Sequence, residues 1–189
     1  MVVGNASIAD VGISVFAEDV VENPKKAFAY RKVNVKVYDA KGNLLKKGTD
    51  YTYDDKSAAD FSTRASSPAA GTGIELTLHG KGFYAGDSNT ENNIKTVRYS
   101  VIQSKSGLKK LSSQGFKVKT NKSMKDAETV EGVKAVTLKA EDFKTNLTMT
   151  ADYTIVGYVH NYEPGTARVV LRGAGNYYGM KVVDFKITE

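Results

Sequence analysis

The richest group of chemically versatile side chains in this sequence lies in residues 157–164, where two tyrosines, a histidine and an asparagine are close together. Aromatic faces can stack on sugar rings, and polar neighbours can bond the sugar hydroxyls. The residues predicted to bind such a ligand are Tyr158, His160 and Tyr162. The alternative interpretation, that these rings complete the edge of a core, is favoured because tryptophan, the strongest platform for sugars, is absent.

A second candidate site is a run of oxygen-bearing side chains at alternate positions, as in calcium-binding loops: Asp87, Asn89, Glu91 and Asn93. A calcium loop of the helix-loop-helix kind needs glycine at its sixth position and a bidentate glutamate at its twelfth. Counted from Asp87, these positions hold Asn92 and Arg98. The match to a metal site is therefore partial, and an exposed hairpin loop is the alternative.

Signatures of catalysis are absent from the sequence. His79 and His160 are the only side chains suited to act as a base near neutral pH, and neither lies in a Gly-x-Ser-x-Gly or His-Glu-x-x-His pattern. The lack of cysteine excludes a thiolate nucleophile and a thiolate metal ligand. We therefore expect no enzymatic activity and no cofactor.

The net charge of +6 is concentrated in residues 105–125, which hold seven lysines and no acidic residue. Such a stretch could attract nucleic acid or an anionic polymer of a cell wall. However, the segment contains no arginine, and Phe116 is its only aromatic residue. Because base recognition relies on arginine and stacking rings, we expect a solvated linker and edge strand, and no nucleic-acid partner.

Three short blocks occur twice in the chain, in the same order. They are Asp-Tyr-Thr at residues 50–52 and 152–154, a Gly-Thr strand that begins at 71 and 165, and a Gly-x-Gly-x-Tyr-x-Gly turn at 80–86 and 173–179. A phosphate cradle places a helix after its glycines, whereas an alternating strand follows both turns. We therefore interpret the shared blocks as scaffold, and expect any specific function in the loops that the copies do not share.

The pattern of the chain predicts an all-β fold. Each copy contains about six or seven short alternating runs separated by turn residues, which is typical of a β-sandwich. Each copy closes on a strand whose alternate residues are apolar: Val97, Tyr99 and Val101 in the first, Val183, Phe185 and Ile187 in the second. We expect two tandem immunoglobulin-like sandwiches, residues 1–102 and 115–189, joined by a linker at 103–114.

Residues 45–52, the Gly-Thr strand, the glycine turn and the closing Phe-Lys-Ile resemble the tandem immunoglobulin-like repeats of large surface proteins from Gram-positive, often gut-dwelling, bacteria. In that family the repeats lie beside leucine-rich repeats, wall-binding repeats or hydrolase domains. The resemblance implies a non-enzymatic spacer whose partners are neighbouring domains of a larger protein. The alternatives are an adhesive module that binds a glycan or a cell-wall polymer, and an accessory domain of a wall or polysaccharide hydrolase.

The first nine residues lack the basic start and apolar run of a signal peptide, and no 18-residue apolar segment occurs. We therefore expect no insertion into a membrane. Together with the resemblance, this predicts a secreted or cell-surface location, with the export signal and the anchor outside this segment.

Overall fold

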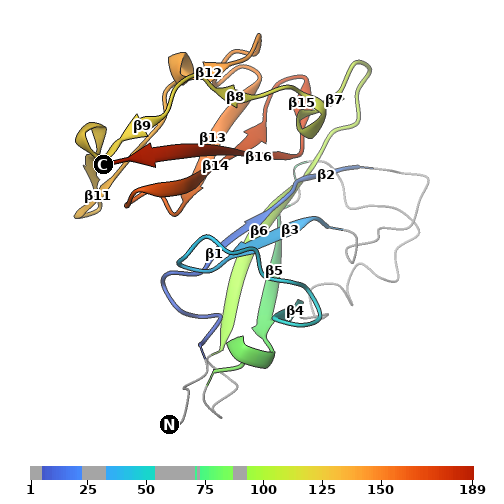
Figure 1. Ribbon diagram of the computed structural model, residues 1–189. Helices are drawn as coiled ribbons and strands as arrows, with labels where there is room; N and C mark the ends of the chain where they lie inside the picture. The colour runs from blue at the N-terminus through green and yellow to red at the C-terminus, as the bar shows by residue number, and fades with distance from the viewer. Residues whose placement is uncertain (1–5, 23–32, 54–70, 72, 87–92) are drawn as a thin grey trace. The chain divides into compact units, whose positions relative to one another are not determined.

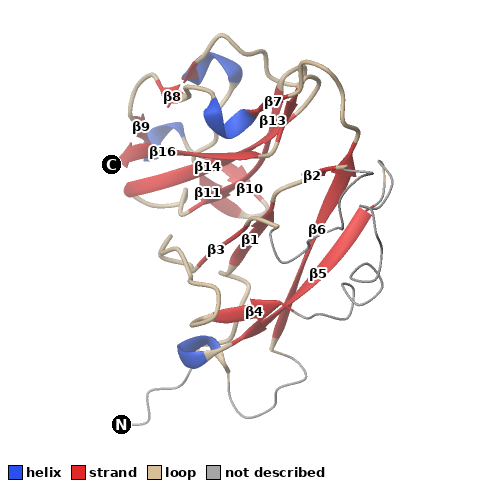
Figure 2. Ribbon diagram, turned by 90° about the vertical axis from the view of Figure 1, so that its right-hand side faces the viewer, coloured by secondary structure: helices blue, strands red, loops and turns tan. Residues whose placement is uncertain are grey.

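The computed structural model describes residues 6–22, 33–53, 71, 73–86 and 93–189, and these are mainly β-strand. Helix in these ranges is limited to single 3₁₀ turns, drawn in blue in Figure 2: η2 (Gly82–Tyr84), η4 (Leu111–Ser113), η5 (Met124–Asp126) and η6 (Ala140–Asp142). The expected all-β class is therefore confirmed. The chain divides into two compact units, Met1–Lys105 and Ser106–Glu189.

The described residues of unit 1 form a four-stranded sheet and a two-stranded sheet (Figure 1). The larger sheet has the order β2 (Val20–Val21), β6 (Ile94–Ile102), β5 (Gly73–Gly80) and β4 (Tyr51–Tyr53). The smaller sheet pairs β1 (Ser14–Ala17) with β3 (Val35–Tyr38). All of these pairings are antiparallel except that of β2 with β6, which is parallel.

The core of unit 1 is built from the apolar faces of both sheets. On β5, Ile74, Leu76 and Leu78 are buried, as strand periodicity requires. Side chains of β1 and β3, including Val37, belong to the same cluster. The Tyr51 hydroxyl donates to the Val35 carbonyl at 3.5 Å, which connects the two sheets across this core.

Unit 2 repeats this arrangement of strands. Its larger sheet has the order β13 (Tyr153–Val159), β14 (Gly165–Gly173), β16 (Met180–Thr188) and β9 (Lys122–Ser123), and only the pairing of β16 with β9 is parallel, as that of β6 with β2 is in unit 1. Its smaller sheet pairs β8 (Lys117–Val118) with β12 (Phe143–Lys144). The register of β13 against β14 shifts between Ile155 and Gly157, so Val156 forms a bulge.

Two further pairings complete unit 2. The hairpin of β10 (Glu128–Val130) and β11 (Val133–Ala135) is antiparallel, and β7 (Lys109–Lys110) lies parallel to β15 (Tyr177–Tyr178). In the core, the rings of Phe116, Phe143 and Tyr153 meet edge to face, with centroids 5.0 to 6.1 Å apart. Such ring pairs stabilise a core beyond the area that they bury.

Most of the segment expected to be a linker, residues 103–114, belongs to unit 2, which begins at Ser106. Its strand β7 pairs with β15, and Leu111 is 0% exposed in the core of unit 2. A single buried leucine among lysines, serines and glycine has no periodicity, which explains why composition alone predicts a linker here.

An aspartate closes the same backbone corner in both units. In unit 1 the Asp50 carboxylate accepts a hydrogen bond from the Lys46 amide at 2.7 Å, and the Gly48 amide donates to the Tyr51 carbonyl at 2.7 Å. In unit 2 the corresponding distances are 2.9 Å from the Thr148 amide to Asp152, and 2.7 Å from the Thr150 amide to the Tyr153 carbonyl. These bonds satisfy backbone groups that the turn would otherwise leave unpaired.

The glycine turn contacts this corner in both units. The carbonyls of Asp50 and Asp152 accept from the amides of Lys81 and Ala174, at 2.8 and 2.9 Å. Gly82 and Gly175 have φ angles of 54° and 56°, and a Cβ at these positions would lie 3.0 and 2.4 Å from a carbonyl oxygen of the corner. Positive φ and close approach of backbone both require glycine, so the geometry of the turn accounts for the motif.

Candidate functional site

The loop that joins β13 to β14, residues 160–164, is the candidate site. Tyr158 lies just before it, and its hydroxyl accepts from the Leu138 amide at 2.7 Å and lies 3.3 Å from the Leu138 carbonyl, to which it can donate. Its ring meets Phe185 edge to face, with centroids 6.4 Å apart. Burial raises the pKa of Tyr158 above its ordinary value. Both the ring and the hydroxyl are therefore engaged within unit 2.

His160 contacts two other residues of the loop, Tyr162 and Glu163. It has a φ of 55°, a left-handed conformation that is uncommon for residues other than glycine. Its Nε2 lies 2.5 Å from Glu163 Oε1, while its Nδ1 is buried without a hydrogen-bond partner. The imidazole meets the ring of Tyr162 edge to face, with centroids 5.4 Å apart. His160, Tyr162 and Glu163 therefore form one local cluster.

Asn161 attaches the loop to a segment 25 residues earlier in the chain. Its Nδ2 donates to the Val136 carbonyl at 2.8 Å, and the Val136 amide donates to the Asn161 backbone carbonyl at 2.8 Å. The sequence indicates only that Asn161 neighbours the aromatic residues, and nothing in it points to Val136. The side-chain amide acts as an extra peptide group that extends the edge of β13.

The three predicted ligand-binding residues therefore differ in what they can offer. The structure brings His160 and Tyr162 together, and directs Tyr158 towards Phe185 and Leu138. Tyr162 is 41% exposed, and the Glu163 side chain is 54% exposed. The loop thus presents to solvent one aromatic face and one carboxylate.

The predicted calcium loop lies largely outside the described residues, since Asp87, Asn89 and Glu91 all fall there. Asn93 is described, and it is 7% exposed. Its Oδ1 accepts from the Ser7 hydroxyl at 2.6 Å and from the Ile8 amide at 2.9 Å, and its Nδ2 donates to the Tyr84 carbonyl at 2.9 Å. The Asn93 amide therefore fastens the start of unit 1 to the glycine turn.

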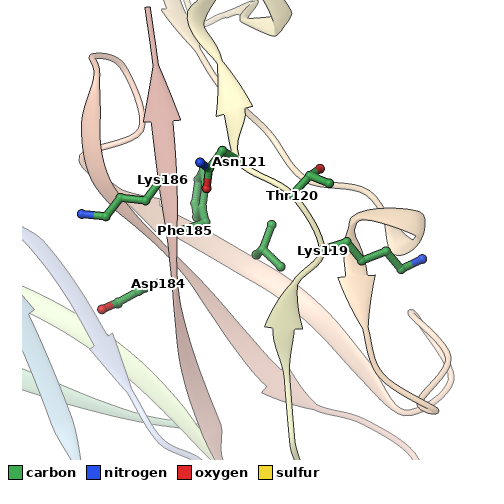
Figure 3. Close-up of a pocket in the computed structure, with 7 residues that line it drawn as sticks. Lys119, Thr120, Asn121, Asp184, Phe185 and Lys186 are labelled. Carbon is green, nitrogen blue, oxygen red and sulfur yellow. The ribbon is translucent and has the colours of Figure 1, made fainter.

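A hollow of about 390 Å³ lies in unit 2 where the chain passes from β8 to β9 (Figure 3). Phe185 and the connection at residues 119–121 line it. Asp184 and Lys186 lie on the other side of β16 from Phe185, and they contact the neighbouring strand β14. Asp184 Oδ1 is 3.1 Å from Arg168 Nε, and Lys186 Nζ donates to the Thr166 hydroxyl. These two charges are thus directed to the outer face of the sheet.

Among the residues that the structure describes, no three acidic or histidine side chains gather closely enough to hold a metal ion. Within the same ranges, no helix has the length and apolar character to cross a bilayer. A scan against models of protein families and a search of curated proteins return no match to this chain.

Proposed function

We propose that the chain is a pair of tandem immunoglobulin-like β-sandwich modules that acts as a non-enzymatic spacer in a secreted or cell-surface protein. The observation that supports this most directly is the aspartate corner, which Asp50 closes in unit 1 and Asp152 closes in unit 2. Both units share this aspartate, and in both it holds the same backbone turn. The shared sequence thus serves the scaffold.

The strand order supports an immunoglobulin-like sandwich. In that fold, strands C, F and G form one sheet, and strands A and B belong to the other. The order β4, β5, β6 in unit 1 corresponds to C, F and G, and β1 and β3 correspond to A and B. In unit 2 the same positions are taken by β13, β14 and β16, and by β8 and β12. The common topology and the repeated blocks favour a duplicated module.

The proposed surface location rests on the resemblance of the shared blocks to the repeats of Gram-positive surface proteins. In this role the partners are the neighbouring domains of a larger protein, which the modules hold apart. A spacer needs stable cores and well-closed turns, and both units contain a contiguous cluster of buried apolar side chains.

A second candidate function is adhesion to a glycan or a wall polymer through the β13–β14 loop. The observation that favours it is the exposed ring of Tyr162 beside His160 and Glu163. One exposed ring is a small platform, because the ring of Tyr158 is packed against Phe185. Any affinity for a glycan should therefore depend on Tyr162.

Binding of the full chain to arrays of glycans and purified wall polymers separates the two functions. The spacer predicts no saturable binding. Saturable binding that is lost in Tyr162→Ala, and retained in the control Tyr178→Ala on β15, would overturn the spacer and support adhesion. Circular dichroism of both variants should match that of the parent, so that a lost signal reports on the loop.

A further inference from the structure

Each unit pairs a strand near its beginning with the strand that ends it, and the two run parallel. In unit 1, Val20 and Val21 of β2 lie opposite Val101 and Ile102 of β6. In unit 2, Lys122 and Ser123 of β9 lie opposite Ile187 and Thr188 of β16. We call these two contacts the terminal clamps.

The parallel direction decides how a terminal clamp responds to tension. When force is applied on the N-terminal side of β2 or β9 and on the C-terminal side of β6 or β16, the two paired strands are drawn in opposite directions. Parallel strands pulled in this way slide along each other, so their evenly spaced hydrogen bonds are strained together. If both strands were pulled from the same end, the bonds would break one after another. Shear therefore requires a higher force than peeling.

Side chains reinforce the clamp of unit 1 on both sides of β2. Before it, the Asp19 carboxylate accepts from the Ser100 amide of β6 at 2.8 Å. After it, the Glu22 amide donates to the Ile102 carbonyl at 2.9 Å, and the Glu22 carboxylate accepts from the Ser104 amide at 3.2 Å. Two acidic side chains thus fasten the entering segment along the last strand.

Unit 2 reinforces the same place with different side chains. The Ser123 hydroxyl donates to the Glu189 carbonyl at 2.9 Å, and the Thr188 hydroxyl donates to the Lys122 carbonyl at 3.2 Å. Lys122 Nζ also lies 3.1 Å from Asp142 Oδ1, with both side chains about four-fifths buried. This ion pair connects β9 to η6, which leads directly into β12 of the other sheet. Charged hydrogen bonds of limited exposure are stronger than neutral ones.

We propose that the terminal clamps resist mechanical tension along the chain by holding each unit closed in shear. The inference rests on the proposed spacer function, since a spacer between a cell wall and a distant domain transmits any force applied to that domain. The proposal is supported by the side chains that reinforce the clamp in each unit. Two acidic side chains do so in unit 1, and two hydroxyl groups and an ion pair do so in unit 2. The corner residues are shared by the units, whereas these bonds differ.

Single-molecule force spectroscopy of the full chain tests the clamp of unit 2. Because the chain has no cysteine, introduced cysteines provide unique attachment points. Cysteines at Thr120, an exposed residue just before β9, and directly after Glu189 strain the β9–β16 contact in shear, whereas cysteines at Lys125 and after Glu189 peel it. Full unfolding between the shear attachment points should lengthen the chain by roughly 20–25 nm, from ~3.3–3.6 Å per residue.

The expected result is a higher first rupture force in the shear geometry than in the peeling geometry. Thr188→Val, which removes one hydroxyl donor of the clamp, should lower the rupture force in shear. Thr129→Val on the exposed strand β10 makes the same chemical change away from the clamp and should not. Equal forces in both geometries would overturn the proposal, as would a Thr188→Val variant that loses the same fraction of force in each geometry. The comparison of geometries needs no variant of the clamp itself.

Failure of the clamp can be distinguished from failure of the spacer. Equal and low rupture forces in both geometries would overturn the clamp proposal. They would be consistent with a spacer that extends under tension. Saturable glycan binding through Tyr162 would overturn the spacer function. The difference in rupture force between the two pulling geometries would still test the clamp.

Discussion

At position 150 a threonine has the left-handed backbone conformation that glycine has at position 48. Their φ angles are 72° and 90°, and their amides make the same 2.7 Å bond to the carbonyl of a following tyrosine. The left-handed region costs about 1–2 kcal/mol for a residue with a Cβ, and more crowding arises when that residue is β-branched. The corner of unit 2 is therefore formed at a conformational cost that unit 1 avoids.

Replacing Thr150 with glycine should stabilise unit 2. Relief of the left-handed strain exceeds the extra chain entropy of glycine, which is about 0.5–1 kcal/mol, so we expect a net gain of up to ~1 kcal/mol in the free energy of unfolding. Gly48→Ala is the matched reverse change and should destabilise unit 1 by about 1 kcal/mol, because alanine must adopt the positive φ. No atom lies within 4 Å of the added Cβ, so no steric clash adds to this cost. Urea denaturation followed by circular dichroism measures both, and a destabilised Thr150→Gly variant would contradict the argument.

The hydroxyl of Tyr158 should matter for stability. Removing it in Tyr158→Phe deletes the bond to the Leu138 amide at 2.7 Å and leaves that backbone group without its side-chain partner. We expect a loss of about 1–2 kcal/mol in the free energy of unfolding. Tyr178→Phe on β15 is the control, because its hydroxyl makes neither of the Leu138 bonds. Equal urea midpoints for the two variants would show that the Tyr158 hydroxyl does not hold this segment.

We expect the free energy of unfolding of unit 2 to depend on pH through the carboxylate of Asp142. Burial acts to raise its pKa. Hydrogen bonds from the Lys139 amide and the Lys122 side chain, together with the positive charges of both lysines, outweigh burial and hold the pKa below the ordinary value of 3.8. A folded-state pKa below the unfolded value adds stability that is complete above pH ~4 and is lost as pH falls through the folded value. Asp142→Asn should remove this contribution, so the difference in stability between parent and variant should shrink between pH 5 and 2. A difference that stays constant over this range would contradict it.

At the scale of elements, the β10–β11 hairpin contains a turn that its sequence only half suits. Glu131 and Gly132 both have positive φ, at 50° and 83°, which is the pattern of a two-residue type I′ turn. Asparagine is favoured at the first of these positions, and glutamate is not. The hairpin register is therefore held in spite of its first turn residue.

Glu131→Asn should stabilise the hairpin by a few tenths of a kcal/mol up to ~1 kcal/mol. Amide hydrogen exchange of residues 128–135 is the direct measurement, with increased protection expected in the variant. Glu75→Asn, which removes the same charge at an exposed position of β5 outside the hairpin, is the control. Faster exchange in Glu131→Asn than in the parent would exclude the turn as the source of strain.

The long strands could be predicted from the sequence, while the short ones could not. Period-two alternation identifies Val183, Phe185 and Ile187 as the core face of β16, and the structure confirms their burial. Strands β8, β9 and β12 have two residues each, which is too short for a period to show. Tyr158 and Leu138 contact each other 20 residues apart, and that partner depends on the tertiary fold. The candidate loop is visible in the sequence, but the direction of each of its rings is not.

At the scale of the whole molecule, the boundary between the units gives a test with two fragments. Residues 106–189 contain the full core cluster of unit 2, whereas residues 115–189 lack Leu111 and strand β7. We expect the longer fragment to fold alone. Loss of one fully buried leucine costs about 2–5 kcal/mol, so the shorter fragment should be far less stable or unfolded. Dispersed NMR amide signals report on each, and a shorter fragment as stable as the longer one would place 109–113 outside the folded unit.

The bulge at Val156 has a consequence for how two units with the same strand arrangement can coexist in a chain. Strand β13 lies at the edge of its sheet, and exposed edges invite pairing with similar strands nearby. Neighbouring units of one chain emerge from the ribosome together at a high local concentration, which makes exchange of strands between them a hazard. A bulge interrupts the even spacing of donors and acceptors along the edge. The irregularity of β13 therefore opposes pairing of this edge with a strand of the other unit while both are still folding.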